Sequence, residues 1–96
     1  MGYHVSEANK LQYFAQSYKV LSKFDEFIFV RLMTLGKTSG AFFKEQGIFH
    51  SNMRKWRKLE SRPSDENFKK MAQVLEVPVE KLIEIFDQAR KEKGYE

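Results

Sequence analysis

Residues 38–56, "TSGAFFKEQGIFHSNMRKW", predict two short helices separated by one glycine. In the first segment Thr38 or Ser39 is the predicted N-cap, and we expect a short helix that ends at Gly47. The second helix is expected over residues 49–58. Two short helices joined by a tight turn are typical of a helix-turn-helix.

The second segment has an apolar side and a polar side. Ile48, Met53 and Trp56 recur at helical spacing, so we expect these side chains to face the core. The other side is polar and cationic, with His50, Ser51, Arg54, Lys55, Lys58 and, at its margin, Asn52. Short polar side chains near a helix start can reach base edges in the major groove, and long cations can neutralise phosphates. This division predicts a DNA-recognition helix.

The rest of the chain predicts further helices. Apolar residues at helical spacing over residues 8–35 predict one bent helix or two, with Gly36 as the stop. Ser64 is the predicted N-cap of a later helix, and a last helix follows Pro78. We therefore expect an all-α fold, a small bundle of five or so helices.

The expected organisation is a single domain over residues 1–96. Residues 1–23 are predicted to form an N-terminal helical extension, residues 24–88 the helix-turn-helix bundle, and residues 89–96 a charged tail. The extension either covers the core or provides a dimer surface, since Tyr3, Tyr13, Phe14 and Tyr18 are large amphipathic residues of the kind that interfaces favour. The sequence leaves both roles open.

Charge is concentrated in the middle of the chain. The formal net charge is +4, yet residues 36–63 alone contain seven Lys or Arg residues against Glu45 and Glu60. A localised positive face attracts polyanions, whereas an evenly spread charge affects only solubility. Trp56 would have to be exposed to serve as a stacking platform for single-stranded nucleic acid. Its phase with Met53 favours a core position instead.

Several function classes lack support in the sequence. The chain has no Cys and only two His residues, so we expect no disulfide, no metal site and a reducing compartment, the cytoplasm. Neither a secretory signal nor an apolar run long enough for a membrane span is present. Phosphate-binding and nucleophile motifs are also absent, so we expect no enzyme and no cofactor.

From Thr38 to about Ile85 the chain resembles the Cro and phage-repressor type of helix-turn-helix domain, the XRE family. The resembling features are Thr38, Phe42, Gly47-Ile48, Met53, Trp56, Pro63-Ser64 and the tail "NFKKMAQVLEVPVEKLIEI". The resemblance implies a lambda-repressor-like fold with Phe24–Leu35 as the first family helix and residues 1–23 as an addition.

The resemblance also implies roles for individual residues. His50, Ser51, Asn52 and Lys55 would lie against bases. The DNA backbone would be met by Lys37, Ser39, Arg54 and Lys58, and Thr38, which opens the first helix, belongs to the same predicted DNA-binding set.

The sequence thus predicts a sequence-specific regulator of transcription, of bacterial, phage or mobile-element origin, that binds double-stranded DNA as a homodimer. The alternative is a protein-binding module, antitoxin-like or inhibitor-like, with degenerate DNA binding. Departures from the family pattern favour this alternative. They lie at Phe43, Gln46, Phe49, Arg57 and Leu59, and at Leu59 the family customarily has Gly. Because the chain has no room for a separate ligand domain, regulation by a small molecule would act on this domain or through a partner.

Overall fold

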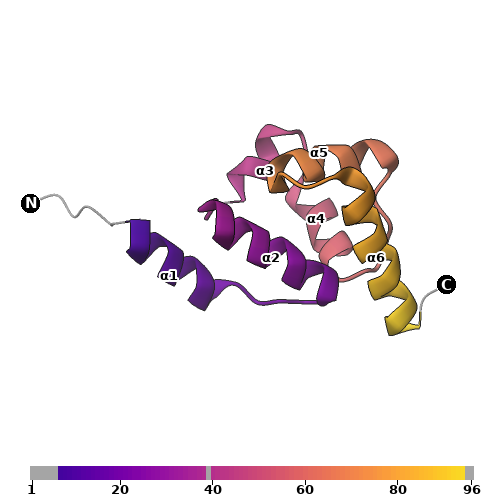
Figure 1. Ribbon diagram of the computed structural model, residues 1–96, viewed down its shortest axis with the longest axis horizontal. Helices are drawn as coiled ribbons and strands as arrows, with labels where there is room; N and C mark the ends of the chain where they lie inside the picture. Colours follow the sequence, from indigo (N-terminus) through magenta and orange to yellow (C-terminus); the bar gives the residue numbers. More distant parts are fainter. Residues whose placement is uncertain (1–6, 39, 95–96) are drawn as a thin grey trace, which may run out of the picture.

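The structure is a computed structural model that describes residues 7–38 and 40–94. Predictions that fall on Tyr3 and Ser39 lie outside the described residues. The described chain forms six helices, α1 (Glu7–Ser17), α2 (Lys23–Leu35), α3 (Ala41–Glu45), α4 (His50–Arg57), α5 (Asp65–Leu75) and α6 (Val79–Lys93) (Figure 1). These residues include no strand, and the predicted all-α class is confirmed.

The N-terminal region forms two helices rather than one bent helix. The break covers residues 18–22. It ends at Ser22, whose backbone is extended and whose hydroxyl accepts the Asp25 N–H at 3.0 Å as the N-cap of α2. Gly36 ends α2 with φ at +71°, a left-handed conformation that glycine adopts without strain. The Lys37 N–H then bonds to the Leu32 carbonyl at 2.9 Å, and the predicted stop is confirmed.

The core lies where α2, α5 and α6 pack on one another, and α3 packs on α5. Each of the three helices contributes a fully buried Phe, respectively Phe24, Phe68 and Phe86. The Phe86 ring meets the Phe24 ring at 4.8 Å and the Phe68 ring at 5.6 Å between centroids, both edge to face. This geometry is favoured by the ring quadrupoles.

The start of α3 differs from the prediction. The helix begins at Ala41 rather than after Thr38 or Ser39, and its N-cap, Gly40, has no side chain to bond. The Gly40 carbonyl accepts the N–H groups of Phe43 and Lys44, so the first turn closes there and Thr38 lies outside the helix.

The turn between α3 and α4 depends on Gly47, which has φ at +80°. Beyond it, the Ile48 N–H bonds back to the Phe43 carbonyl at 3.1 Å. The predicted glycine turn is therefore present, although α3 itself stops at Glu45.

The predicted charged tail is largely helical. Helix α6 continues to Lys93, because Ala89 is buried against the core and Glu92 forms an ion pair with Lys23 of α2 at 2.9 Å. Gly94, with φ at +97°, ends the helix.

Two non-glycine residues share a left-handed backbone and offer a test of what stabilises the fold. Leu59 has φ at +64° and is 1% exposed, whereas Glu76 has φ at +54° and is exposed. Relief of the backbone should stabilise either glycine variant by about 1 kcal/mol, but loss of a buried Leu costs about 2–5 kcal/mol. We expect Leu59→Gly to lower the free energy of unfolding in urea and Glu76→Gly to raise it slightly. A stabilised Leu59→Gly variant would contradict this view of the core.

Candidate nucleic-acid interface

Helix α4 has the two sides that the sequence predicts. Met53 and Trp56 are 7% and 5% exposed, and Ile48 in the preceding turn is 3% exposed, so all three belong to the core. The buried Trp56 is not available as a stacking platform. In the view of Figure 1, α4 lies behind α2 and α6.

The opposite side of α4 collects most of the predicted site residues. Exposed there are His50, Ser51, Asn52, Arg54 and Lys55. Lys58, the C-cap of α4, is half-buried. Along this eight-residue helix the short polar side chains lie at the N-terminal end, and the long cations lie toward the C-terminal end.

The N-terminal end of α4 is open. Its N-cap, Phe49, is extended at φ −79° and ψ 146° and has no side-chain hydrogen bond to the helix. The Phe49 ring is 70% exposed. The first amides of α4 therefore lack a side-chain acceptor, and an anion that approaches this end would find both donors and a favourable helix dipole.

Lys37 does not join the α4 surface. Its ammonium donates to the Val74 carbonyl and lies 3.3 Å from a carboxylate oxygen of Glu76. Nearby, Arg31 donates from Nε to the Leu75 carbonyl at 3.1 Å. Both cations thus bind the C-terminal end of α5, where the helix dipole favours positive charge. Lys37 is held by the fold, and this weakens its predicted role at the DNA backbone.

Thr38 is half-buried and precedes α3, while Ser39 lies outside the described residues. A further cation, Lys44, is exposed on α3, next to the turn that leads into α4. In the described part of the chain, no ion pair involves Lys44, Arg54, Lys55 or Lys58. Lys44 belongs to the basic segment of the sequence but is not among the predicted site residues.

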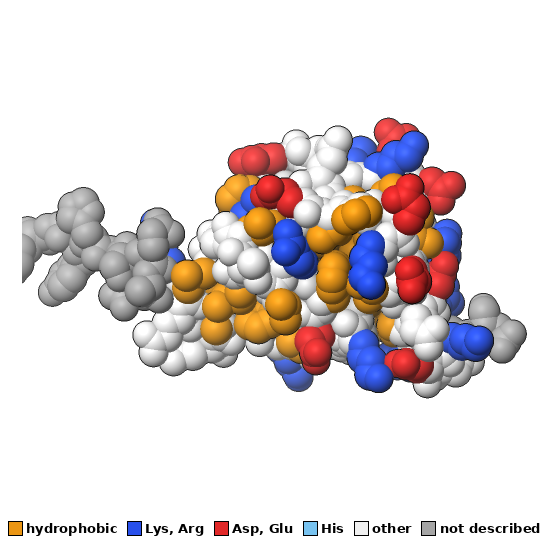
Figure 2. All heavy atoms as spheres, in the orientation of Figure 1, with side chains coloured by type: hydrophobic (Ala, Val, Ile, Leu, Met, Phe, Trp, Pro, Cys, Tyr) orange, Lys and Arg blue, Asp and Glu red, His pale blue; other side chains and the backbone are white. Residues whose placement is uncertain are grey.

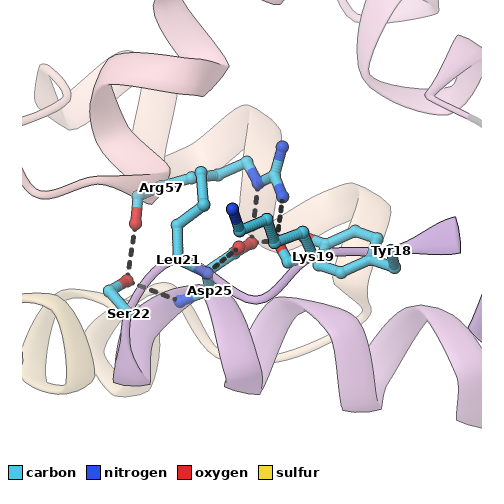
Figure 3. A network of polar contacts seen from close by, with 6 residues as sticks. All are labelled: Tyr18, Lys19, Leu21, Ser22, Asp25 and Arg57. Carbon is cyan, nitrogen blue, oxygen red and sulfur yellow. Dashed lines mark hydrogen bonds and ion pairs between the residues drawn. The ribbon is translucent and has the colours of Figure 1, made fainter.

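Arg57, the last residue of α4, is turned away from this surface. Its Nε donates to Asp25 Oδ1 at 2.8 Å, and its Nη2 donates to the Lys19 carbonyl at 2.9 Å (Figure 3). Asp25 is fully buried. The charge of Arg57, which the sequence counts in the basic run, is therefore neutralised inside the protein.

The Asp25 carboxylate has two further donors from the segment that joins α1 to α2. The Tyr18 hydroxyl donates to Oδ1, and the Leu21 N–H donates to Oδ2 at 2.8 Å. The Arg57 guanidinium also lies 4.6 Å from the centroid of the Tyr18 ring, within cation–π range.

Ser22 completes the network of polar contacts in Figure 3. Its hydroxyl donates to the Arg57 carbonyl at 2.6 Å while it accepts the Asp25 N–H. Both the backbone and the side chain of Arg57 are thus bonded to the α1–α2 junction, which fixes the C-terminal end of α4.

This network was not predicted from the sequence. A local signal was available, since Ser22 and Asp25 have the spacing of a capping box, with an acidic residue three positions after the N-cap. The partner was not visible, because Arg57 is 32 residues further along the chain.

Burial raises the pKa of Tyr18, and the hydrogen bond to the Asp25 carboxylate raises it further, while Arg57 acts in the opposite direction. A tyrosine whose pKa is raised in the folded state stabilises that state. The stabilisation is complete at pH values below the pKa of the tyrosine in the unfolded chain, about 10. Above that pH the unfolded chain loses the proton first, so the contribution to stability is lost as the pH rises.

No helix in the described residues combines the length and the apolarity that a membrane crossing requires. Within the same residues, no cluster of three or more His, Asp or Glu side chains is placed to hold a metal ion.

The Asp25–Arg57 pair is tested by a double-mutant cycle. Removing one partner of a buried ion pair leaves the other charge without compensation and costs about 3–5 kcal/mol. We expect Asp25→Ala and Arg57→Ala each to lower the free energy of unfolding, and the double variant to lose clearly less than the sum. The matched control is the exposed pair Lys23–Glu92, whose variants should have far smaller effects. Additive losses at Asp25 and Arg57 would show that the two residues act independently.

The raised pKa of Tyr18 is tested by the pH dependence of the free energy of unfolding. Between pH 8 and 11 we expect the free energy of unfolding to fall by about 1 kcal/mol less in Tyr18→Phe than in the parent chain, because the variant lacks the group that titrates only when unfolded. Tyr13→Phe, with a side chain that is 73% exposed, is the control and should follow the parent chain. Equal pH profiles for all three proteins would refute a raised pKa at Tyr18.

Comparison with known proteins adds no relative: no family model, no curated protein and no solved structure shows significant similarity to this chain.

Proposed function

We propose that this chain is a sequence-specific, double-stranded DNA-binding regulator of transcription in which α4 enters the major groove. The observation that carries the proposal is the exposed polar side of α4, which lies opposite the buried Met53 and Trp56 and contains cations without an ion-pair partner among the described residues. The α3–turn–α4 arrangement presents this side outward, as a helix-turn-helix requires.

In this proposal the residues at the start of α4 contact bases. His50, Ser51 and Asn52 are short and exposed near the N-terminal end, and Lys55 follows one turn later. Phosphates are contacted by Arg54 and Lys58, joined by Lys44 from α3 and by the uncapped amides of α4.

The backbone at Leu59 supports the proposed relation to the XRE family. The family customarily has Gly at this position, and Leu59 adopts a left-handed φ of +64°, a conformation that glycine favours. A bulky residue in such a conformation is expected where the local backbone is kept and the side chain is used to fill the core. Leu59 is 1% exposed.

A homodimer is part of the proposal. Figure 2 shows apolar side chains gathered over α1 and α2 on one face, and Tyr13 and Val30 of these helices are 73% and 51% exposed. For both α4 helices to enter successive major grooves, a second copy bound there would have to place them about 34 Å apart, and the operator would be palindromic. We further propose that the protein acts in the cytoplasm of a bacterium, or on phage or mobile-element DNA, without catalysis.

One observation favours a second candidate function, a protein-binding module. The Phe49 ring is 70% exposed at the entrance of α4, and an aromatic side chain of this kind is more typical of protein interfaces than of phosphate contacts. In that case the basic face would bind an acidic protein partner, as an antitoxin or inhibitor does.

Selection from a random duplex library at low and near-physiological salt separates the two functions. With about four phosphates neutralised per protomer, and so about eight per homodimer, a fourfold rise in salt should lower the affinity of the dimer about 10,000-fold. A palindromic motif that survives the higher salt supports the regulator. Binding that is weak, indifferent to sequence and lost at the higher salt supports the protein-binding module.

Substitutions on α4 test direct readout. We expect His50→Ala and Lys55→Ala to reduce discrimination between the selected site and single-base variants by about 1–3 kcal/mol. Lys58→Ala should weaken all sequences alike. Lys69→Ala, an exposed cation on α5, is the control and should change neither property. Uniform weakening by all the α4 variants would show that α4 does not read bases.

A further inference from the structure

A groove of about 690 Å³ lies beside the start of α4, between the N-terminal segment and the helix-turn-helix. Phe14 and Tyr18 line one side, and Phe43, Phe49 and Met53 line the other. We propose that this groove binds an amphipathic organic anion, with an aliphatic or aromatic body among these side chains and a carboxylate or similar head group at the mouth.

The walls of the groove are suited to the apolar body of the proposed ligand. The volume falls within the range of about 300–1,000 Å³ that is typical of small-molecule sites. Phe14 packs against Phe29 at 5.8 Å and against Tyr18 at 5.2 Å between ring centroids, which holds one wall in place. In the opposite wall Phe43 and Met53 are buried core residues, so this part of the groove is present before a ligand arrives.

The basic side chains of the groove are suited to the anionic head group of the proposed ligand. Three basic side chains line the groove, Lys44, His50 and Arg57, and no Asp or Glu is among its described lining residues. Asp25 neutralises Arg57 at 2.8 Å, so Arg57 contributes little net charge. Lys44 and His50 are exposed and pair with no carboxylate in the described chain, and they lie where a head group would remain in contact with water.

Charge also argues against a second copy of the chain as the occupant. In a symmetric contact the same surface meets itself, so each Lys44 would approach the cations of the other copy. Like charges brought together across an interface are unfavourable. A small anion instead supplies a negative charge, which no side chain among the described lining residues provides.

The site has a consequence for regulation that rests on the proposed function. Lys44 and His50 line the groove and also belong to the proposed DNA-contacting surface. An anion bound there would neutralise groups that otherwise meet phosphate or bases, so ligand and duplex should each weaken the binding of the other.

The binding test uses octanoate and 1-octanol, which share a chain length and differ in charge, in NMR titrations of the full chain. We expect both to perturb residues of the groove and Lys44→Glu to weaken octanoate about tenfold while 1-octanol is unchanged. Lys69→Glu, with the same charge change on α5, should affect neither probe. Ala41→Phe adds a ring to a groove-lining position and should weaken both.

Three results would overturn the proposal: no saturable shift with either probe, equal effects of Lys44→Glu on both probes, or equal effects of Lys44→Glu and Lys69→Glu. A sedimentation measurement could give a fourth result that would overturn the proposal. A dimer that excludes both probes and dissociates in Phe49→Ala would show that a second copy fills the groove. Octanoate binding by a chain that fails to select any duplex would support the groove and count against the proposed function, so the two failures are distinguishable.

Discussion

The buried carboxylate of Asp25 is the constraint on which the arrangement of the helices depends. A charge taken out of water costs several kcal/mol unless hydrogen bonds and an opposite charge compensate it. Here the compensation comes from Tyr18 and Leu21 before α2 and from Arg57 at the end of α4. Because these donors belong to segments far apart in the sequence, satisfying one carboxylate fixes the junction of α1 and α2 against the end of α4.

This constraint divides the basic run of α4 into two groups of cations. Arg57 is half-buried and compensates the buried Asp25, whereas Arg54 and Lys55 are exposed on the other side of the helix. Exposed cations can be exchanged with little effect on folding, whereas the partner of a buried charge cannot. A net positive charge counted along the sequence therefore overstates the charge that a polyanion meets.

A structural feature could be predicted from the sequence where its cause lies within a few neighbouring residues. The burial of Met53 and Trp56 results from helical spacing, and the turn at Gly47 from the backbone freedom of one residue, so both predictions were correct. The surroundings of Lys37 and Arg57 could not be predicted, because the partners of both side chains are set by tertiary packing. Lys37 bonds to the Val74 carbonyl, 37 residues away, and no periodicity along the chain reveals such a contact.

The open start of α4 links the two proposed binding surfaces. Phe49 provides no side-chain acceptor for the first amides of the helix, and its exposed ring forms part of the groove wall. An anion at this end, whether a phosphate of DNA or the head group of a small ligand, would meet the same amides and the same His50 and Lys44 side chains. In a chain of 96 residues this overlap is the simplest physical route by which a ligand could alter DNA binding, because shared groups couple two sites without any movement of domains.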